Sequence, residues 1–231
     1  MLLYFFKNKD WNMTELGHIE KPEAISFKEK RKLFVVPTLP FEELSVEIDI
    51  DKAKVERFWG EVKEKIEYFR STYGNISVVF IEGVSENETK GIELFERFGK
   101  EGNHYKFLKN MVDMGAKLKG IDKTGSLMQG KLLFDEYSKS FSPEVMEIHK
   151  GFYGKDIDFD KWREYLVKRI QETQEEISKH ATGILSALPE NSNGILIFTD
   201  GRPLEYPQGI DVFQIRPPAF DELSKLLRDK M

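Results

Sequence analysis

Short apolar runs without polar alternation constrain the fold of this chain more than any other feature. The clearest run is ISVVFI at residues 76–81, similar runs cover 33–36 and 195–198, and further strands are predicted over 116–121 and 212–215. A strand that is covered on both faces must be apolar at nearly every position, whereas a half-exposed antiparallel strand alternates. The runs therefore predict a sheet that is buried between two layers.

Amphipathic helices are predicted between these runs. Apolar residues recur at three- and four-residue spacing over 51–71 and over 160–188. Weaker patterns predict helices over 89–98, 104–114, 127–139, 144–150 and 220–228. Strands that are separated by helices favour a three-layer α/β fold, with a mostly parallel central sheet and helices on both faces.

The length of the chain, 231 residues, is enough for one large domain or two small ones. We expect residues 1–231 to form a single α/β domain. The amino terminus has an apolar run but no leading positive charges and no small-residue cleavage site, so it predicts a first strand over 2–6 and not a signal peptide. Residues 125–158 lack a strand pattern and predict a helical insertion or cap within the domain.

The composition excludes several classes of function. The chain has no cysteine, which excludes disulfides, cysteine nucleophiles and thiolate metal sites. A net charge of −5 gives no basic footprint, so nucleic acid is not expected as a partner. No apolar run approaches the roughly 20 residues that cross a bilayer, so we expect a soluble, cytoplasmic protein without membrane contact. Scarce Gln with plentiful Lys, Glu, Ile and Phe leans toward a thermophilic source.

Acidic residues follow three of the predicted strands closely: Glu82, Asp122 and Asp200. In an open parallel sheet the carboxyl ends of the strands meet at one edge, and ligands bind outside that edge. Carboxylates that gather there repel each other, so they need a divalent metal, a shared proton or nearby cations. The three acids are therefore candidate catalytic residues and candidate ligands of Mg²⁺ or Mn²⁺.

Other polar residues near the predicted strand ends are candidates for binding a small molecule: Thr38, Glu43, Lys123 and Arg216. In a hydrolytic reaction an acid would position or deprotonate water, while Arg202 or Lys123 would stabilise the developing negative charge. The alternative is that each acid caps the following helix or pairs with an arginine, since strand-to-helix turns commonly carry Asp or Glu for capping alone.

Common catalytic and nucleotide-binding motifs are absent from the sequence. The glycines never form GxGxxG or GxxxxGKS, and there is no GxSxG elbow. The four histidines are scattered and none stands at metal-ligand spacing, so an imidazole-based metal site is not expected.

Five segments carry a family resemblance: FVVPTLPFEE (34–43), VVFIEGV (78–84), AKLKGIDKT (116–124), DKWREYLVKRI (160–170) and ILIFTDGRPLEY (195–206). In this order they resemble the superfamily of TraB-type proteins, ChaN-type proteins and erythromycin-esterase-type hydrolases. The resemblance implies that Glu82, Asp122 and Arg163 take the positions of family site residues. The histidines that the family carries after the first and last segments are missing here, so the resemblance implies a divergent member without the histidine-dependent chemistry.

Two functions remain open at this point. The first is a hydrolase that acts on a small molecule through Glu82, Asp122, Asp200 and Arg202, with or without a divalent cation. The second is a non-catalytic binding or assembly protein that retains the scaffold. It would show rim carboxylates used in internal salt bridges and an exposed apolar surface on residues 125–158 or on the closing helix. Either protein could form a homo-oligomer.

Overall fold

The computed structural model describes residues 30–39, 51–86, 92–96, 100, 102–153 and 158–230. A five-stranded sheet forms its centre, with strands β1 (Arg31–Thr38), β2 (Ile76–Ser85), β3 (Lys117–Asp122), β4 (Asn193–Thr199) and β5 (Ile210–Gln214). Their order is β3-β2-β4-β1-β5, and every pair of neighbours is parallel. The predicted strand 2–6 and the candidate residue Glu43 lie outside the described residues.

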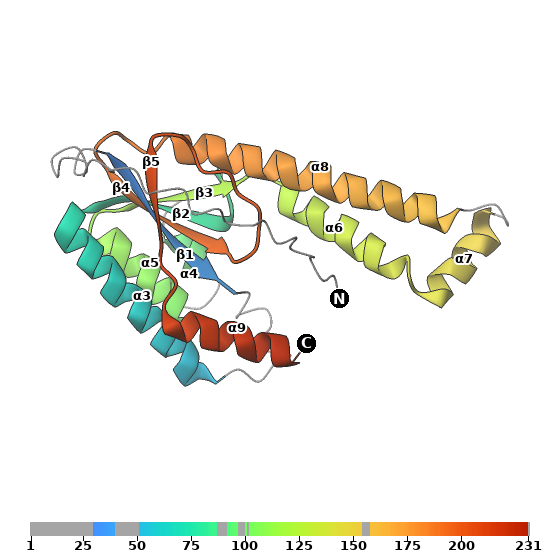
Figure 1. Cartoon of the computed structure of the whole chain (residues 1–231), viewed down its shortest axis with the longest axis horizontal. Helices are drawn as coiled ribbons and strands as arrows, with labels where there is room; N and C mark the ends of the chain where they lie inside the picture. Colours follow the sequence, from blue (N-terminus) through green and yellow to red (C-terminus); the bar gives the residue numbers. More distant parts are fainter. Residues whose placement is uncertain are drawn as a thin grey trace, which may run out of the picture.

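Helices cover both faces of the sheet (Figure 1). One face is covered by α3 (Lys52–Tyr73), α5 (Asn103–Asp113) and α9 (Pro218–Lys230), and the other by the carboxyl-terminal half of α8 (Phe159–Ser186). The short helix α4 (Glu93–Glu96) is the described part of the helix predicted over 89–98. The predicted three-layer α/β fold is confirmed, and the described sheet is wholly parallel.

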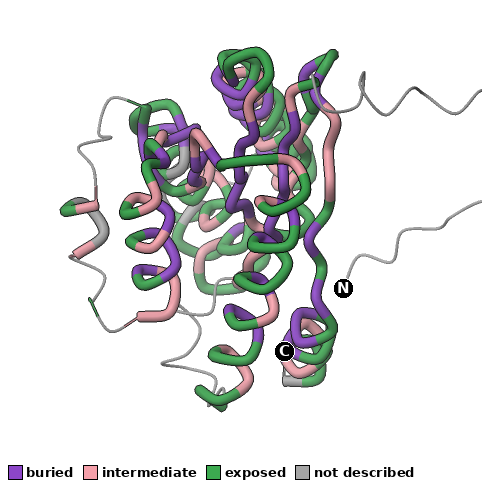
Figure 2. Tube along the Cα trace, turned by 90° about the vertical axis from the view of Figure 1, so that its left-hand side faces the viewer, coloured by how far each residue is buried: buried purple, intermediate pink, exposed green. Residues whose placement is uncertain are grey.

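The continuous apolar runs supply two cores, one on each face. In β1, Phe34 and Val36 belong to the core under α3, whereas Leu33 and Val35 belong to the core under α8. This follows from the two-residue period of a strand, which sends successive side chains to opposite faces. Figure 2 shows the result, with buried residues concentrated in the strands and on the inward sides of the helices.

Local signals fix the ends of α3. The Asp51 side chain accepts a hydrogen bond from the Ala53 amide at 2.9 Å, which satisfies one of the unpaired N–H groups of the first turn. At the other end Gly74 has a φ of 99°, a conformation that glycine adopts without strain. The predicted helix over 51–71 is therefore found at almost the predicted place.

A helical arm extends away from the sheet (Figure 1). We define the arm as α6 (Ser126–Lys139), α7 (Pro143–Tyr153), residues 140–142 between them and residues 159–172 of α8, and we call the remainder the body. Helix α6 packs along α8. The arm therefore contains the helices of the segment 125–158 together with the first half of the longest helix in the described chain.

Candidate functional site

A bulge at the end of β2 shapes the carboxyl edge of the sheet. The pairing of β2 with β3 shifts register between Ile81 and Ser85, and Gly83 within this step has a φ of 85°. A bulge of this kind bends a strand and re-aims its side chains. Strand β2 therefore continues through Ser85, four residues beyond the predicted strand, and Glu82 lies within its bulged end.

The facing residue of β3 must be a glycine. A Cβ built on Gly120 would lie 2.3 Å from the carbonyl oxygen of Val84, which is closer than two such atoms can approach. The bulge can therefore press against β3 only because Gly120 has no side chain. Strand β3 runs one residue further than predicted, so that Asp122 is its last residue.

Arg202 joins the two acids from β2 and β3, and we call Glu82, Asp122 and Arg202 the Arg202 cluster. Its Nη1 donates to Oε1 of Glu82, and its Nη2 donates to Oδ1 of Asp122 at 2.8 Å. The backbone supplies the other two donors: the Thr199 amide to Glu82 Oε2, and the Gly83 amide to Asp122 Oδ2 at 2.6 Å. Each of the four carboxylate oxygens thus accepts a hydrogen bond.

The Arg202 cluster is removed from most solvent. The side chain of Asp122 is 2% exposed, and those of Glu82 and Arg202 are 15% and 16% exposed. Burial by itself lowers the pKa of the Arg202 guanidinium, but the two carboxylates outweigh burial and raise its pKa above the ordinary value. Arg202 also lies over the ring of Phe198, 5.3 Å from its centroid. The clustered acids are therefore compensated by a fixed arginine.

The same arrangement does not fit a divalent cation. In the described part of the chain, no group of three or more Asp, Glu or His side chains is placed to hold a metal. The position between Glu82 and Asp122 is taken by the guanidinium, which already supplies the positive charge. No chemical step through Mg²⁺ or Mn²⁺ follows from this geometry.

Asp200 belongs to a separate ion-pair group at the same edge. Arg216 Nη1 lies 3.2 Å from Asp200 Oδ1, and Arg216 Nε lies 2.8 Å from Asp221 Oδ1. These side chains are exposed, where an ion pair contributes only about 0–1 kcal/mol. The structure therefore brings Glu82, Asp122 and Arg202 together but gives Asp200 a different partner.

A cavity of about 260 Å³ lies beside these two groups. Its lining includes Pro37, Thr199, Asp200, Arg202, Tyr206 and Arg216. The sequence did not single out Tyr206, whose hydroxyl accepts a hydrogen bond from Gln214 Nε2 at 3.2 Å. Tyr206 lies in the loop after β4, and no periodicity marks a residue in such a loop.

The remaining predicted site residues are spread over the molecule. Thr38 ends β1, and its carbonyl accepts a hydrogen bond from the Asp200 amide at 2.9 Å. Lys123 is exposed and lines a different cavity, of about 200 Å³, at the start of α6.

Arg163 lies on the arm, and its prediction as a residue of the strand-end site is wrong. Its Nη2 donates to the Ser140 carbonyl at 2.8 Å, and its guanidinium lies 4.4 Å from the centroid of the Phe141 ring. A helix rises about 1.5 Å per residue, so Arg163 stands about 27 Å along α8 from Ala181, which contacts the sheet. The length of α8 separates Arg163 from the Arg202 cluster.

The arm carries an exposed apolar surface, which we call the arm surface. Its six large side chains are 51% to 69% exposed: Met128, Leu132, Phe134, Phe141, Ile148 and Tyr165. On the described part of the body only Tyr68 reaches that exposure. Of the described side chains on α6 and α7, only Ser126 is buried. Helices α6 and α7 therefore lack the covered apolar face that the body helices have.

No protein-family model matches the chain, and no curated protein or solved structure matches it either. Among the described residues, no helix is both long enough and apolar enough to span a membrane.

Proposed function

We propose that this protein acts by binding, as an assembly protein on an α/β scaffold, and that its arm pairs with the arm of a second copy. The observation that carries this proposal is the arm surface, with six large apolar side chains more than half exposed on one projecting element. Apolar side chains that are scattered singly over a surface need no explanation, whereas several large ones gathered on one element indicate an interaction site.

The helices of the arm need a partner to bury their apolar residues. Most of the stability of a helix in a protein comes from packing of an apolar face. Helix α3 buries Phe58, Val62 and Ile66 against the sheet, whereas α6 has Leu132 and Phe134 at about 60% exposed. Covering such a side chain contributes about 1.5–3 kcal/mol. Pairing of two arms would supply that cover.

The charges on α6 favour a second copy as the partner. Lys131, Asp135, Glu136 and Lys139 place both signs along the helix beside the apolar residues. Two copies of α6 that run antiparallel can therefore set opposite charges against each other. Symmetric pairs of identical subunits are also the commonest soluble oligomers. A single-sign helix would instead favour a partner of the opposite charge.

The Arg202 cluster supports binding over hydrolysis. A general base must reach the proton that it removes, directly or through one water molecule. All four oxygens of Glu82 and Asp122 already accept hydrogen bonds, two of them from a guanidinium. Taking a proton from water would neutralise one of these carboxylates and weaken its ion pair with the largely buried Arg202 guanidinium.

Sedimentation measurements over a wide range of protein concentration test the assembly. We expect a dimer for the wild type and a monomer for the double variant Leu132→Gln, Phe134→Gln. The matched control is Tyr68→Gln, which removes an equally exposed aromatic residue from the body and should leave the dimer intact. A wild-type protein that stays monomeric at every concentration would refute the proposal.

Spin labels locate the contact. Because the chain has no cysteine, Phe134→Cys can be labelled at that position alone, and Tyr68→Cys gives the control on the body. Two arms in contact should give a short distance between the labels at position 134 and a long one between the labels at 68. The reverse pattern would show a dimer formed through the body and would contradict the arm as the contact.

A small-molecule site at the carboxyl edge is the second candidate, supported by the cavity of about 260 Å³ between Arg202 and Arg216. With this candidate we also propose that the chain is a divergent member of the TraB, ChaN and erythromycin-esterase superfamily and that it hydrolyses esters or related compounds. The variants Glu82→Gln and Asp122→Asn test it, because they keep the shape of each side chain and remove its charge. Turnover of a panel of esters and phosphoesters that is lost in both variants would favour the hydrolase over the assembly protein.

A further inference from the structure

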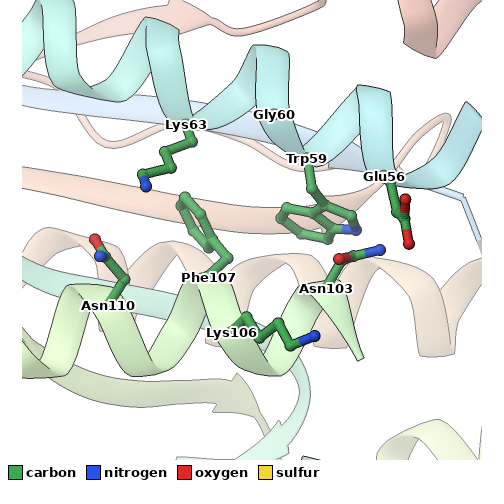
Figure 3. A pocket seen from close by; sticks show the side chains of 8 residues that line it. All are labelled: Glu56, Trp59, Gly60, Lys63, Asn103, Lys106, Phe107 and Asn110. Carbon is green, nitrogen blue, oxygen red and sulfur yellow. The ribbon is translucent and has the colours of Figure 1, made fainter. Parts of the chain in front are cut away.

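A groove between α3 and α5 has no part in the assembly or in the carboxyl edge. It encloses about 410 Å³, within the range of about 300–1,000 Å³ that is usual for small-molecule sites. Its lining residues come from both helices (Figure 3): Glu56, Trp59, Gly60, Lys63, Asn103, Lys106, Phe107 and Asn110. None of them lines the cavity at the carboxyl edge.

Aromatic rings form a fixed wall of the groove. Trp59 and Phe107 lie with ring centroids 5.3 Å apart at 36°, and both side chains are almost fully buried. His104 stacks on Trp59 at 5.2 Å, with an angle of 13° between the rings. Three rings from two helices therefore hold one another in place, and the groove presents a rigid apolar edge.

The polar side chains of the groove offer more positive than negative charge. Lys63 comes from α3 and Lys106 from α5, whereas Glu56 is the one carboxylate in the lining. Within the described residues Lys63 has no ion-pair partner. In Figure 3 its side chain extends from α3 into the space between the two helices, beside Phe107.

The Asn110 side chain and the start of α5 add hydrogen-bonding groups to the groove. Asn110 Oδ1 is buried and has no hydrogen-bond partner in the structure. Buried polar groups are nearly always paired, and an unpaired one requires an explanation. Asn103 begins α5, whose first turn has no acidic residue and no side-chain cap, so its N–H groups also favour an anion. A donor group on a ligand would satisfy Asn110 Oδ1, which accepts hydrogen bonds, while the N–H groups of the first turn of α5 would face its negative charge.

We propose that this groove binds a small organic anion, with Lys63 and Lys106 supplying the positive charge and the edges of Trp59 and Phe107 contacting its apolar part. Gly60 leaves room for that apolar part, because a Cβ added there would meet no atom within 4 Å. Binding of this kind is independent of the pairing of two arms.

The fluorescence of Trp59 measures binding directly. The chain has three tryptophans, so Trp11→Phe with Trp162→Phe leaves Trp59 as the single reporter. Phenyl phosphate is the probe, because it joins a dianion to a flat apolar ring. We expect a saturable change with phenyl phosphate and much weaker changes with inorganic phosphate or phenol. A missing response, or an equal response to phenol, would overturn the proposal.

Matched variants test the geometry. We expect Lys63→Gln and Lys106→Gln each to weaken binding of phenyl phosphate about tenfold, the usual effect of losing one charge-assisted hydrogen bond. Lys225→Gln on α9 makes the same charge change outside the groove and should not alter binding. An equal loss in Lys225→Gln would show that net charge alone attracts the probe.

Two glycine variants test whether binding needs the open volume of the groove. Gly60→Leu fills the groove and should abolish binding, while Gly183→Leu adds the same side chain at an equally open glycine of α8 and should leave it unchanged. Both substitutions replace a helical glycine with a good helix former, so both proteins should remain folded. Retained binding in Gly60→Leu would refute the groove as the site.

Discussion

The body and the arm of this protein are built from similar helices but differ in what covers those helices. Helix α3 buries five large apolar residues against the sheet, whereas Ser126 is the sole buried side chain among those described on α6 and α7. Both regions have apolar residues at helical spacing. The comparison teaches that such spacing shows only that a helix needs cover, and that the cover can come from the same chain or from another one.

The largest expected effect contrasts two phenylalanines. Phe34→Ala removes a fully buried ring that stacks on Phe69 at 4.6 Å, and should cost about 4 kcal/mol of unfolding free energy. Phe134→Ala on the arm should cost less than about 0.5 kcal/mol in dilute, monomeric protein. Urea unfolding of both variants checks the pair. Equal losses would mean that the arm surface is already covered within one chain.

The next effect contrasts two arginines. Arg202→Met leaves Glu82 and Asp122 buried without their cation, and should cost about 3 kcal/mol, the lower end for breaking a buried ion pair.

The matched control is Arg169→Met on the arm, where the partner Glu172 lies at 2.8 Å in an exposed pair. It should cost less than about 1 kcal/mol. A cost for Arg202→Met as small as this would show that the Arg202 cluster is solvated and that its acids are available for chemistry.

The layers of the body were predictable from the sequence because a strand that is buried on both faces has a recognisable composition. A strand covered on both faces is apolar throughout, and ISVVFI and ILIF have that composition. The order of the strands was not predictable, since it depends on which strands lie side by side and no local pattern records this. The bulge at Gly83 escaped prediction for the same reason, because it is a relation between β2 and Gly120 of β3.

The candidate site was predictable only in part. The carboxyl ends of parallel strands meet at one edge, and this rule correctly placed Glu82 and Asp122 together. The rule could not assign ion-pair partners. Arg202 pairs with both acids and Arg216 with Asp200 because of the path of the loop after β4, which has no periodic pattern. An exposed apolar surface was expected on residues 125–158 or on the closing helix if the protein assembles, but spacing could not choose between the two, since exposed and buried apolar residues of a helix can have the same spacing.

Replacing a glycine by alanine should change the unfolding free energy with opposite signs in the body and in the arm. Gly120→Ala forces a Cβ against the Val84 carbonyl and should cost about 3 kcal/mol through overpacking beside the bulge. Gly130→Ala in α6 meets no atom within 4 Å and should stabilise the arm by about 1 kcal/mol, because alanine favours a helix more than glycine does. Thermal unfolding measures both. A neutral result for Gly120→Ala would show that the bulge relaxes away from β3.

The smallest effect concerns the pH dependence of the body. Burial lowers the pKa of His104 from 6.5 to about 4, in agreement with the buried position of its Nε2. The folded state therefore holds the neutral imidazole, while the unfolded state takes up a proton below pH 6.5. The stabilising contribution of neutral His104 is complete above pH 6.5 and falls as the pH drops toward 4, with about 2 kcal/mol lost by pH 5.

His104→Phe keeps a ring against Trp59 and removes the titrating group. Its unfolding free energy, measured in urea at pH 7 and pH 5, should change by about 2 kcal/mol less than that of the wild type. An identical change in the two proteins would mean that His104 takes up its proton in the folded state near its ordinary pKa. The imidazole would then be in contact with water, and the packing of α5 against α3 would be as loosely covered as the arm.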